Sequence, residues 1–210
     1  MAHLLIFGAS RGTGAAVLAY AQQQGHQCTV VIRDKAQAEA LIKQGISVFV
    51  GDANDAGLVE QACLKVGRQA TIISTMGGSK ANYQAQMNVI KQAEKAGISR
   101  MIMVTSLGCG DSWPTLSERA KQAFGLAVRE KTLAEVWLQT SELDFCILRP
   151  GGLRDGEPTH RATAYINQEV HGFVMRTDLA LLILAQVSQA SLGHQIFSVI
   201  DPDLDAVRNR

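Results

Sequence analysis

The sequence predicts an α/β fold in which helices cover both faces of a single, doubly wound parallel sheet. Short apolar runs alternate along the chain with segments of helical pattern. These runs are apolar throughout and do not alternate with polar residues, as expected for strands that are buried on both faces. The first run leads directly into a glycine-rich turn and then into a helical segment. Such alternation indicates βαβ units with right-handed crossovers.

The expected strands are followed by helical segments of ordinary length. Strands are expected at 3–7, 27–32, 46–50, 70–74, 100–105 and 144–149, and helices near 12–24, 35–44, 55–65, 80–96 and 117–140. Gly25 and Gly97 stand at helix ends, where a left-handed φ is favoured. Beyond 150, glycines and a proline predict a loop region over about 150–176 that includes a short strand at 162–166. A helix at about 177–190 and a strand at 195–200 complete the sheet.

Length and composition limit the possible functions. The 210 residues suit one domain over 1–210, and a net charge of +1 without a basic stripe gives no sign of a nucleic-acid partner. The chain starts with a strand and has no apolar run near the ~20 residues of a membrane span. Four cysteines without metal-ligand spacing predict no metal site. We therefore expect a cytoplasmic protein without a membrane partner, and a monomer because no long helix shows a second apolar face.

The glycine-rich turn predicts a binding site for a dinucleotide. Gly8 allows a tight turn, Gly12 allows the backbone to approach a diphosphate, and Gly14 allows close packing of the helix on the strand. The helix N-terminus adds free N–H groups and the positive end of its dipole. The alternative is a strand–helix turn that binds nothing. The turn residues expected to contact the cofactor are Gly8, Ser10, Arg11, Gly12, Thr13 and Gly14.

Arg33, directly after the second strand, favours NADP over NAD. An acid usually stands here to bind the adenosine ribose of NAD, whereas an arginine suits a 2′-phosphate. Arg11 lies within reach of the same phosphate. Two alternatives stay open at this point. Arg33 is a solvated charge at the strand end, or a shift of one residue places Asp34 in the position of the NAD-type acid.

Small and polar residues follow the other strands and are expected to complete the site. Asp52 either accepts a hydrogen bond from the adenine amino group or caps the next helix. The segment with Thr75, Met76 and Gly77 either lies against the cofactor or forms a turn without a ligand. Near the nicotinamide we expect Ser106, which otherwise bonds to its own loop, and the residues after the sixth strand, Pro150, Gly151, Gly152 and Leu153.

Four segments together resemble the atypical branch of the short-chain dehydrogenases/reductases, and within it the small biliverdin IXβ and flavin reductases. They are LLIFGASRGTG at 4–14, TVVIRD at 29–34, MVTSLG at 103–108 and LRPGGLRDGEPT at 148–159, with VMRTDLALLIL at 174–184 in addition. The resemblance implies a Rossmann fold, NADPH as cofactor and Ser106 as the active-site serine. It also implies acceptors such as flavins and linear tetrapyrroles.

The sequence departs from these relatives in two places. The glycine spacing is that of the main branch of the superfamily, and Arg11 stands where the atypical reductases often have glycine. The catalytic Tyr-x-x-x-Lys pair of the main branch is missing, because Ala127 stands four residues before Lys131. An alcohol dehydrogenase needs such a phenol as its acid/base, so its absence favours reduction of a flat, conjugated acceptor.

The expected function is therefore NADPH-dependent hydride transfer to biliverdin or a flavin such as FMN, with Ser106 as the catalytic residue. A non-catalytic NADP-binding redox sensor or assembly factor remains the alternative. A sugar-nucleotide epimerase is disfavoured by the chain length and the missing tyrosine. The candidates for substrate contact are Trp113, Arg154, His160 and Arg161, each of which is otherwise an ordinary surface or loop-covering residue.

Overall fold

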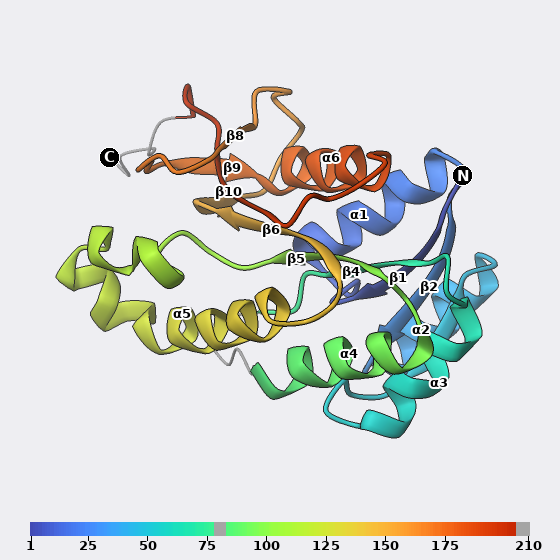
Figure 1. Ribbon diagram of the computed structural model, residues 1–210. Helices are drawn as coiled ribbons and strands as arrows, with labels where there is room; N and C mark the ends of the chain where they lie inside the picture. The colour runs from blue at the N-terminus through green and yellow to red at the C-terminus, as the bar shows by residue number, and fades with distance from the viewer. Residues whose placement is uncertain (78–82, 205–210) are drawn as a thin grey trace.

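The computed structural model describes residues 1–77 and 83–204 (Figure 1). In these ranges the strands of the main sheet are β1 (His3–Phe7), β2 (Gln27–Ile32), β3 (Ser47–Val50), β4 (Thr71–Ser74), β5 (Arg100–Val104), β6 (Asp144–Pro150), β8 (Thr163–Tyr165) and β10 (Gln195–Ile200). The α-helices are α1 (Gly12–Gln23), α2 (Lys35–Lys43), α3 (Ala56–Val66), α4 (Tyr83–Ala96), α5 (Glu118–Gln139) and α6 (Arg176–Val187). The predicted α/β fold is confirmed.

The strand order β3-β2-β1-β4-β5-β6-β10-β8 gives the sheet its switch point. β1 pairs in parallel with both β2 and β4, so the chain winds outward in opposite directions from this pair. Only β8 runs antiparallel to its neighbour within the described sheet. In open α/β sheets a ligand lies beyond the carboxyl ends of the strands at such a point.

Each face of the sheet has its own hydrophobic core. Alternate residues of β1 point to opposite faces: Leu4 and Ile6 join the core beneath α1 and α6, whereas Leu5 and Phe7 join the core beneath α3, α4 and α5. Figure 1 shows the two helical layers, α1 and α6 on one side and α3, α4 and α5 on the other. Strands apolar throughout are required here because both of their faces are covered.

The predicted elements agree closely with the observed ones. The six first strands and the helices between them end within a residue or two of the predicted positions, although the start of the helix predicted at 80–96 falls partly outside the described residues. Gly25 and Gly97 have φ of 77° and 73°, the left-handed values predicted for them. The four cysteines are free and buried in the packed interior.

The structure adds elements that the sequence did not predict. β7 (Gly152–Arg154) and β9 (Phe173–Met175) form a separate two-stranded parallel sheet within the region expected to be a loop. A 3₁₀ helix, η1 (Gly110–Thr115), follows β5. Three-residue strands that pair across about 20 residues leave no local pattern, because their pairing depends on the surrounding tertiary structure.

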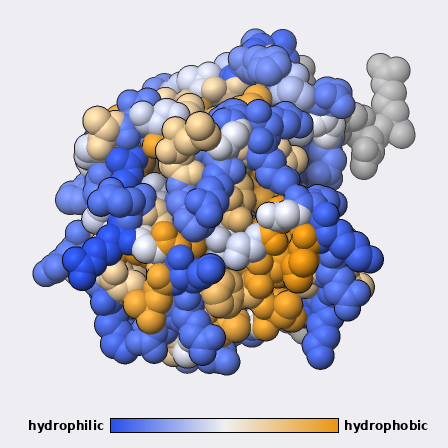
Figure 2. Space-filling model, turned by 90° about the vertical axis from the view of Figure 1, so that its right-hand side faces the viewer, coloured by the Kyte–Doolittle hydropathy of each residue, from blue (hydrophilic) through white to orange (hydrophobic). Residues whose placement is uncertain are grey.

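Figure 2 shows the side of the molecule with α2, α3 and the edge strand β3, where apolar side chains are exposed among hydrophilic ones. The large exposed apolar residues of these three elements are Ile42, Val50 and Leu64. Among the described helices, none has the length and apolar character needed to cross a membrane.

Candidate functional site

A cavity of about 770 Å³ opens at the switch point of the sheet. It lies at the carboxyl ends of β1, β2, β4 and β5, as predicted from the parallel topology. Most of the residues expected to bind the cofactor line it, namely Gly8, Ser10, Arg11, Gly12, Thr13, Gly14, Arg33, Asp52, Thr75, Met76, Gly77 and Leu153. The structure thus brings together residues that are up to 145 positions apart in the sequence.

The glycine-rich turn has no room for side chains at its first and last glycines. A Cβ on Gly14 would lie 2.1 Å from the carbonyl oxygen of Gly8, and Gly8 itself has φ of 86°. The Thr75 hydroxyl is within hydrogen-bond distance (3.2 Å) of the carbonyl oxygens of both Phe7 and Gly8, and so ties the end of β4 to the turn. Helix α1 is therefore packed directly against the end of β1, as the glycine pattern predicts.

The N-terminus of α1 has the features of an anion site. Its N-cap residue, Arg11, makes no side-chain capping bond, and its first turn holds no acidic residue. Thr13 lines the cavity and is 7% exposed, and its buried hydroxyl has no hydrogen-bond partner among the residues that the structure describes. Buried hydroxyls are rarely left without a partner, and free helical N–H groups attract anions. The turn thus fits the diphosphate of a dinucleotide.

Arg33 and Asp52 form an exposed ion pair at the end of the cavity near β2 and β3. Their closest side-chain atoms lie 3.4 Å apart, and 81% of the Arg33 side chain is exposed. The backbone N–H of Asn54 donates to the Asp52 carboxylate and, with the Arg33 charge, holds the pKa of Asp52 below its usual value despite partial burial. Asp52 is therefore a carboxylate that can accept a further hydrogen bond.

The structure decides two of the alternatives left by the sequence. β2 ends at Ile32, and Asp34 caps α2 by accepting from the backbone N–H of Gln37, so Arg33 and not Asp34 lies beside the cavity. Asp55 caps α3 through Gly57 and Leu58. The capping role considered for Asp52 is therefore wrong.

At the end of β5, Thr105 takes the place expected for Ser106. β5 ends at Val104, one residue earlier than predicted, and the cavity is lined by Val104 and Thr105 but not by Ser106. Ser106 is partly buried, and its carbonyl oxygen accepts a hydrogen bond from the backbone N–H of Cys109. The role of Ser106 in catalysis stays a prediction.

Lys131 on α5 lines the cavity and was not among the predicted site residues. Its ammonium donates to the carbonyl oxygen of Thr105 at 3.0 Å, while a Cβ on Gly77 would lie 3.5 Å from its side chain. Burial lowers the pKa of Lys131 below 10.5, partly opposed by the charge of Glu135. The i,i+4 spacing of Lys131 and Glu135 places both on one helix face, and this was the signal available in the sequence.

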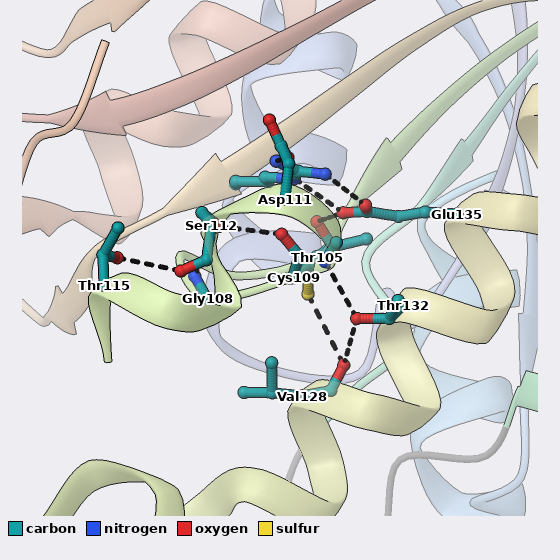
Figure 3. A network of polar contacts seen from close by, with 11 residues as sticks. Thr105, Gly108, Cys109, Asp111, Ser112, Thr115, Val128, Thr132 and Glu135 are labelled. Carbon is teal, nitrogen blue, oxygen red and sulfur yellow. Dashed lines mark hydrogen bonds and ion pairs between the residues drawn. The ribbon is translucent and has the colours of Figure 1, made fainter. Parts of the chain in front are cut away.

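A buried polar network supports this side of the cavity (Figure 3). The Glu135 carboxylate accepts from the Thr105 hydroxyl at 2.6 Å and from Arg149 at 2.7 and 3.0 Å. Arg149 also pairs with the exposed Asp111 at 2.5 Å. Burial alone would lower the pKa of Arg149, but Glu135 and Asp111 raise it above its usual value. The guanidinium is therefore permanently charged, and it joins β6, α5 and η1.

The backbone of η1 is bound to the same network. The backbone N–H of Gly110 donates to the Thr132 hydroxyl at 3.0 Å. A Cβ on Gly110 would lie 2.6 Å from Arg149. Burial, with the charge of Glu135, raises the pKa of the Cys109 thiol to about 12. Contacts with α5 and β6 therefore hold the segment after β5 in place. They also fix the Thr105 carbonyl group, to which Lys131 donates.

The predicted residues of the late region lie mostly outside the cavity lining. Gly151 and Gly152 allow β7 to approach β9, because Cβ atoms there would lie 2.3 Å from the Gly172 oxygen and 2.5 Å from the Phe173 ring. Pro150 is buried at the end of β6. These positions therefore have a packing requirement of their own, whereas the role predicted for them beside the nicotinamide stays a prediction.

The four candidates for substrate contact have partners elsewhere. The guanidinium of Arg154 stacks on Phe173, with 4.4 Å to the ring centre. Trp113 packs over α5, where Arg129 lies 5.0 Å from its ring centre. The backbone N–H of His160 donates to Asp178, and Arg161 lies 3.5 Å from Asp201. None of the four is among the residues that line the cavity in the described structure.

Comparison with known proteins agrees with this geometry. Residues 8–190 match a protein family described as NAD(P)H-binding. The structure of ChuY, an anaerobillin reductase from Escherichia coli O157:H7, is 56% identical in sequence and superimposes with a TM-score of 0.94 over 97% of this chain and 98% of that one. ChuY from the E. coli strain CFT073 is 54% identical, with a TM-score of 0.91 over 98% of this chain and 100% of that one.

A curated relative is more distant. It is a Bacillus subtilis protein named as an uncharacterized sugar epimerase, YhfK, which is 26% identical over 95% of this chain and 94% of its own length. The predicted resemblance to short-chain reductases and the predicted nicotinamide dinucleotide cofactor are thereby confirmed. The extent of the family match, together with a cavity built around the glycine-rich turn, establishes that this chain belongs to the NAD(P)H-binding family.

Proposed function

We propose that this protein is an NADPH-dependent reductase that transfers a hydride to a linear tetrapyrrole of the bilin type. The observation that carries the proposal is 56% identity to an anaerobillin reductase along nearly the whole length of both chains. The cavity supports it, because a dinucleotide-type turn forms part of its wall, as a reductase that uses NADPH requires.

The preference for NADPH rests on two arginines at one end of the cavity. Arg33 and Arg11 both line it and both are exposed. The Arg33–Asp52 pair is long and solvated, so a 2′-phosphate competes successfully with Asp52 for the guanidinium. Asp52 is then free to accept from the adenine amino group.

At the other end, the protein's part is to bind and orient. Bound NADPH supplies the hydride, and the protein must hold two flat ring systems in contact. Lys131 uses one of its three N–H donors on Thr105, which leaves others for hydroxyl or carboxylate groups in the cavity. Ala127 occupies the position of the catalytic tyrosine of related dehydrogenases, so no phenol–lysine pair is available on α5 for alcohol chemistry.

The test is oxidation of NADPH or NADH by the purified protein, followed by loss of absorbance of the reduced nicotinamide. Anaerobillin, biliverdin isomers and FMN serve as acceptors in separate reactions. Turnover with NADPH and a bilin, much faster than with FMN, supports the proposal. Turnover with FMN alone identifies a flavin reductase. Tight NADPH binding in calorimetry without turnover of any acceptor indicates a non-catalytic NADP-binding protein.

A further inference from the structure

The small second sheet brings two opposite charges to the rim of the cavity. β7 and β9 are parallel, with Arg154 paired to Met175, so the next residues, Asp155 and Arg176, leave the sheet side by side. Their side chains form an ion pair of 2.7 Å, and both line the cavity. The Asp155 side chain is 85% exposed, whereas that of Arg176 is 28% exposed. This asymmetry shows that the arginine points inward and that the aspartate covers it from the solvent side.

Arg176 reaches from the second sheet to the glycine-rich turn. Its Nε and Cδ atoms lie 3.2 and 3.3 Å from the position that a Cβ on Gly12 would occupy. Gly12 begins α1, whose first turn has no acidic residue. The buried Thr13 hydroxyl belongs to the same turn, and it has no hydrogen-bond partner in residues 1–77 and 83–204. A guanidinium, a helix N-terminus and an unpartnered hydroxyl therefore meet at one place.

We propose that Arg176 is a ligand of the cofactor's diphosphate and that it exchanges Asp155 for this diphosphate when the cofactor binds. An exposed carboxylate is a weak partner, because solvent screens the attraction. A diphosphate at the turn carries two charges and receives helical N–H groups as well, so it is the stronger partner. Asp155 then acts as a competing anion that lowers cofactor affinity.

Arg176 is proposed to bind a different part of the cofactor from Arg33 and Arg11. Arg33 lies beyond β2 and discriminates the 2′-phosphate, whereas Arg176 lies at the turn after β1. Arg176 should therefore contribute equally to the binding free energies of NADPH and NADH. The proposal rests on the NAD(P)H-binding character of the chain and does not depend on the identity of the acceptor.

Calorimetric titration with ligand fragments tests the assignment. ADP-ribose contains the diphosphate but no 2′-phosphate, and 2′-AMP contains a 2′-phosphate but no diphosphate. Arg176→Gln should raise the Kd of NADP⁺ and ADP-ribose by similar factors, about tenfold, and change the Kd of 2′-AMP less than about twofold. Asp155→Asn should lower the Kd of NADP⁺ and ADP-ribose by about two- to fivefold. In the double variant the gain from Asp155→Asn should disappear.

Two control variants each remove one exposed charge, with the sign of Asp155 in one case and the sign of Arg176 in the other. Glu157→Gln lies on the same segment as Asp155, and Arg119→Gln removes an exposed arginine from α5; both should leave all three Kd values within about twofold. Far-UV circular dichroism checks folding, and the Asp155→Asn measurement tests the exchange even if Arg176→Gln does not fold.

Three results would overturn the proposal. A weaker ADP-ribose complex for Asp155→Asn would show that Asp155 orients Arg176 and does not compete. Equal losses of 2′-AMP and ADP-ribose in Arg176→Gln would indicate an unspecific electrostatic effect. Unchanged cofactor binding with a raised KM for the acceptor would assign Arg176 to an acceptor carboxylate. Because the binding measurements need no acceptor, they remain valid if the protein reduces no bilin.

Discussion

One charged pair lines the cavity and is exposed, whereas another lies buried behind the opposite end of the cavity, where it contacts Thr105. Near β2 and β3, Arg33 and Asp52 face each other with 81% and 43% of their side chains exposed, at 3.4 Å. Near β5 and β6, Arg149 and Glu135 are 6% and 1% exposed, at 2.7 Å. Exposed pairs are weak and exchange partners readily, whereas a buried pair is costly to separate. The first arrangement suits ligand selection and the second suits fixed geometry.

The buried pair should give the largest effect. Glu135→Gln leaves the Arg149 charge without its buried partner and should lower the free energy of unfolding by about 3–5 kcal/mol, measured by urea denaturation. The matched control is Asp111→Asn, which removes the exposed partner of the same arginine and should cost less than about 1 kcal/mol. Equal costs for both variants would contradict the distinction between buried and exposed partners.

Substitutions at the exposed end of the cavity should change the preference between NADPH and NADH and leave the stability of the protein unchanged. Removing both guanidinium groups, Arg11→Ala with Arg33→Ala, should raise the Kd of NADPH by about 10- to 100-fold and leave that of NADH nearly unchanged. Lys35→Ala, which removes an exposed cation at the start of α2, is the control. An unchanged preference between NADPH and NADH would remove the 2′-phosphate from this end of the cavity.

Lys131 is half-buried, between the exposed Arg33–Asp52 pair and the buried Arg149–Glu135 pair. It should make cofactor binding depend on pH. Lys131→Met should weaken NADPH binding by about tenfold at neutral pH. Because burial lowers the pKa of Lys131 below 10.5, the wild-type protein should lose this contribution as the pH rises through the lowered pKa. Titration calorimetry at several alkaline pH values should show the loss in the wild type but not in Lys131→Met, and Lys131→Arg should restore binding at high pH.

Rising pH should change the contribution of Lys131 to stability in the opposite direction from its contribution to cofactor binding. The folded protein binds this proton less tightly than the unfolded chain does. Its contribution to the free energy of unfolding therefore increases as the pH rises from the lowered pKa toward 10.5. Cofactor binding and stability should thus change in opposite directions over this pH range, which separates a binding role from a purely structural one.

The smallest effect is expected at Ser106. Ser106→Ala should lower turnover by less than about tenfold and leave the Kd of NADPH unchanged, because the hydroxyl is predicted to act at the reacting centre. Thr105→Val is the comparison, since Thr105 lines the cavity and bonds to Glu135. Steady-state kinetics with a bilin distinguish them; if only Thr105→Val lowers turnover, Ser106 has no part in the mechanism.

The end of the cavity near β2 and β3 was predictable from sequence because its residues directly follow regular strands. Gly8, Arg33 and Asp52 each stand just after an apolar run, and parallel topology brings such positions to one edge. Lys131 and Arg176 were missed because each is placed by tertiary contacts. Lys131 comes from the middle of a long helix, and Arg176 from a strand pairing that has no local pattern. The contacts of Trp113 and Arg161 could not be predicted for the same reason. These tertiary contacts, which lie outside the cavity, leave no local pattern in the sequence.

The buried cysteines make unfolding visible by thiol chemistry. Burial raises the pKa of Cys28 to about 11 and that of Cys63, Cys109 and Cys146 to about 12, so the reactive thiolate is scarce in the native state at neutral pH. Cys28 and Cys146 belong to the core beneath α1 and α6, and Cys63 to the core on the other face. Labelling by an alkylating reagent, read by peptide mass, therefore reports which face of the sheet opens first.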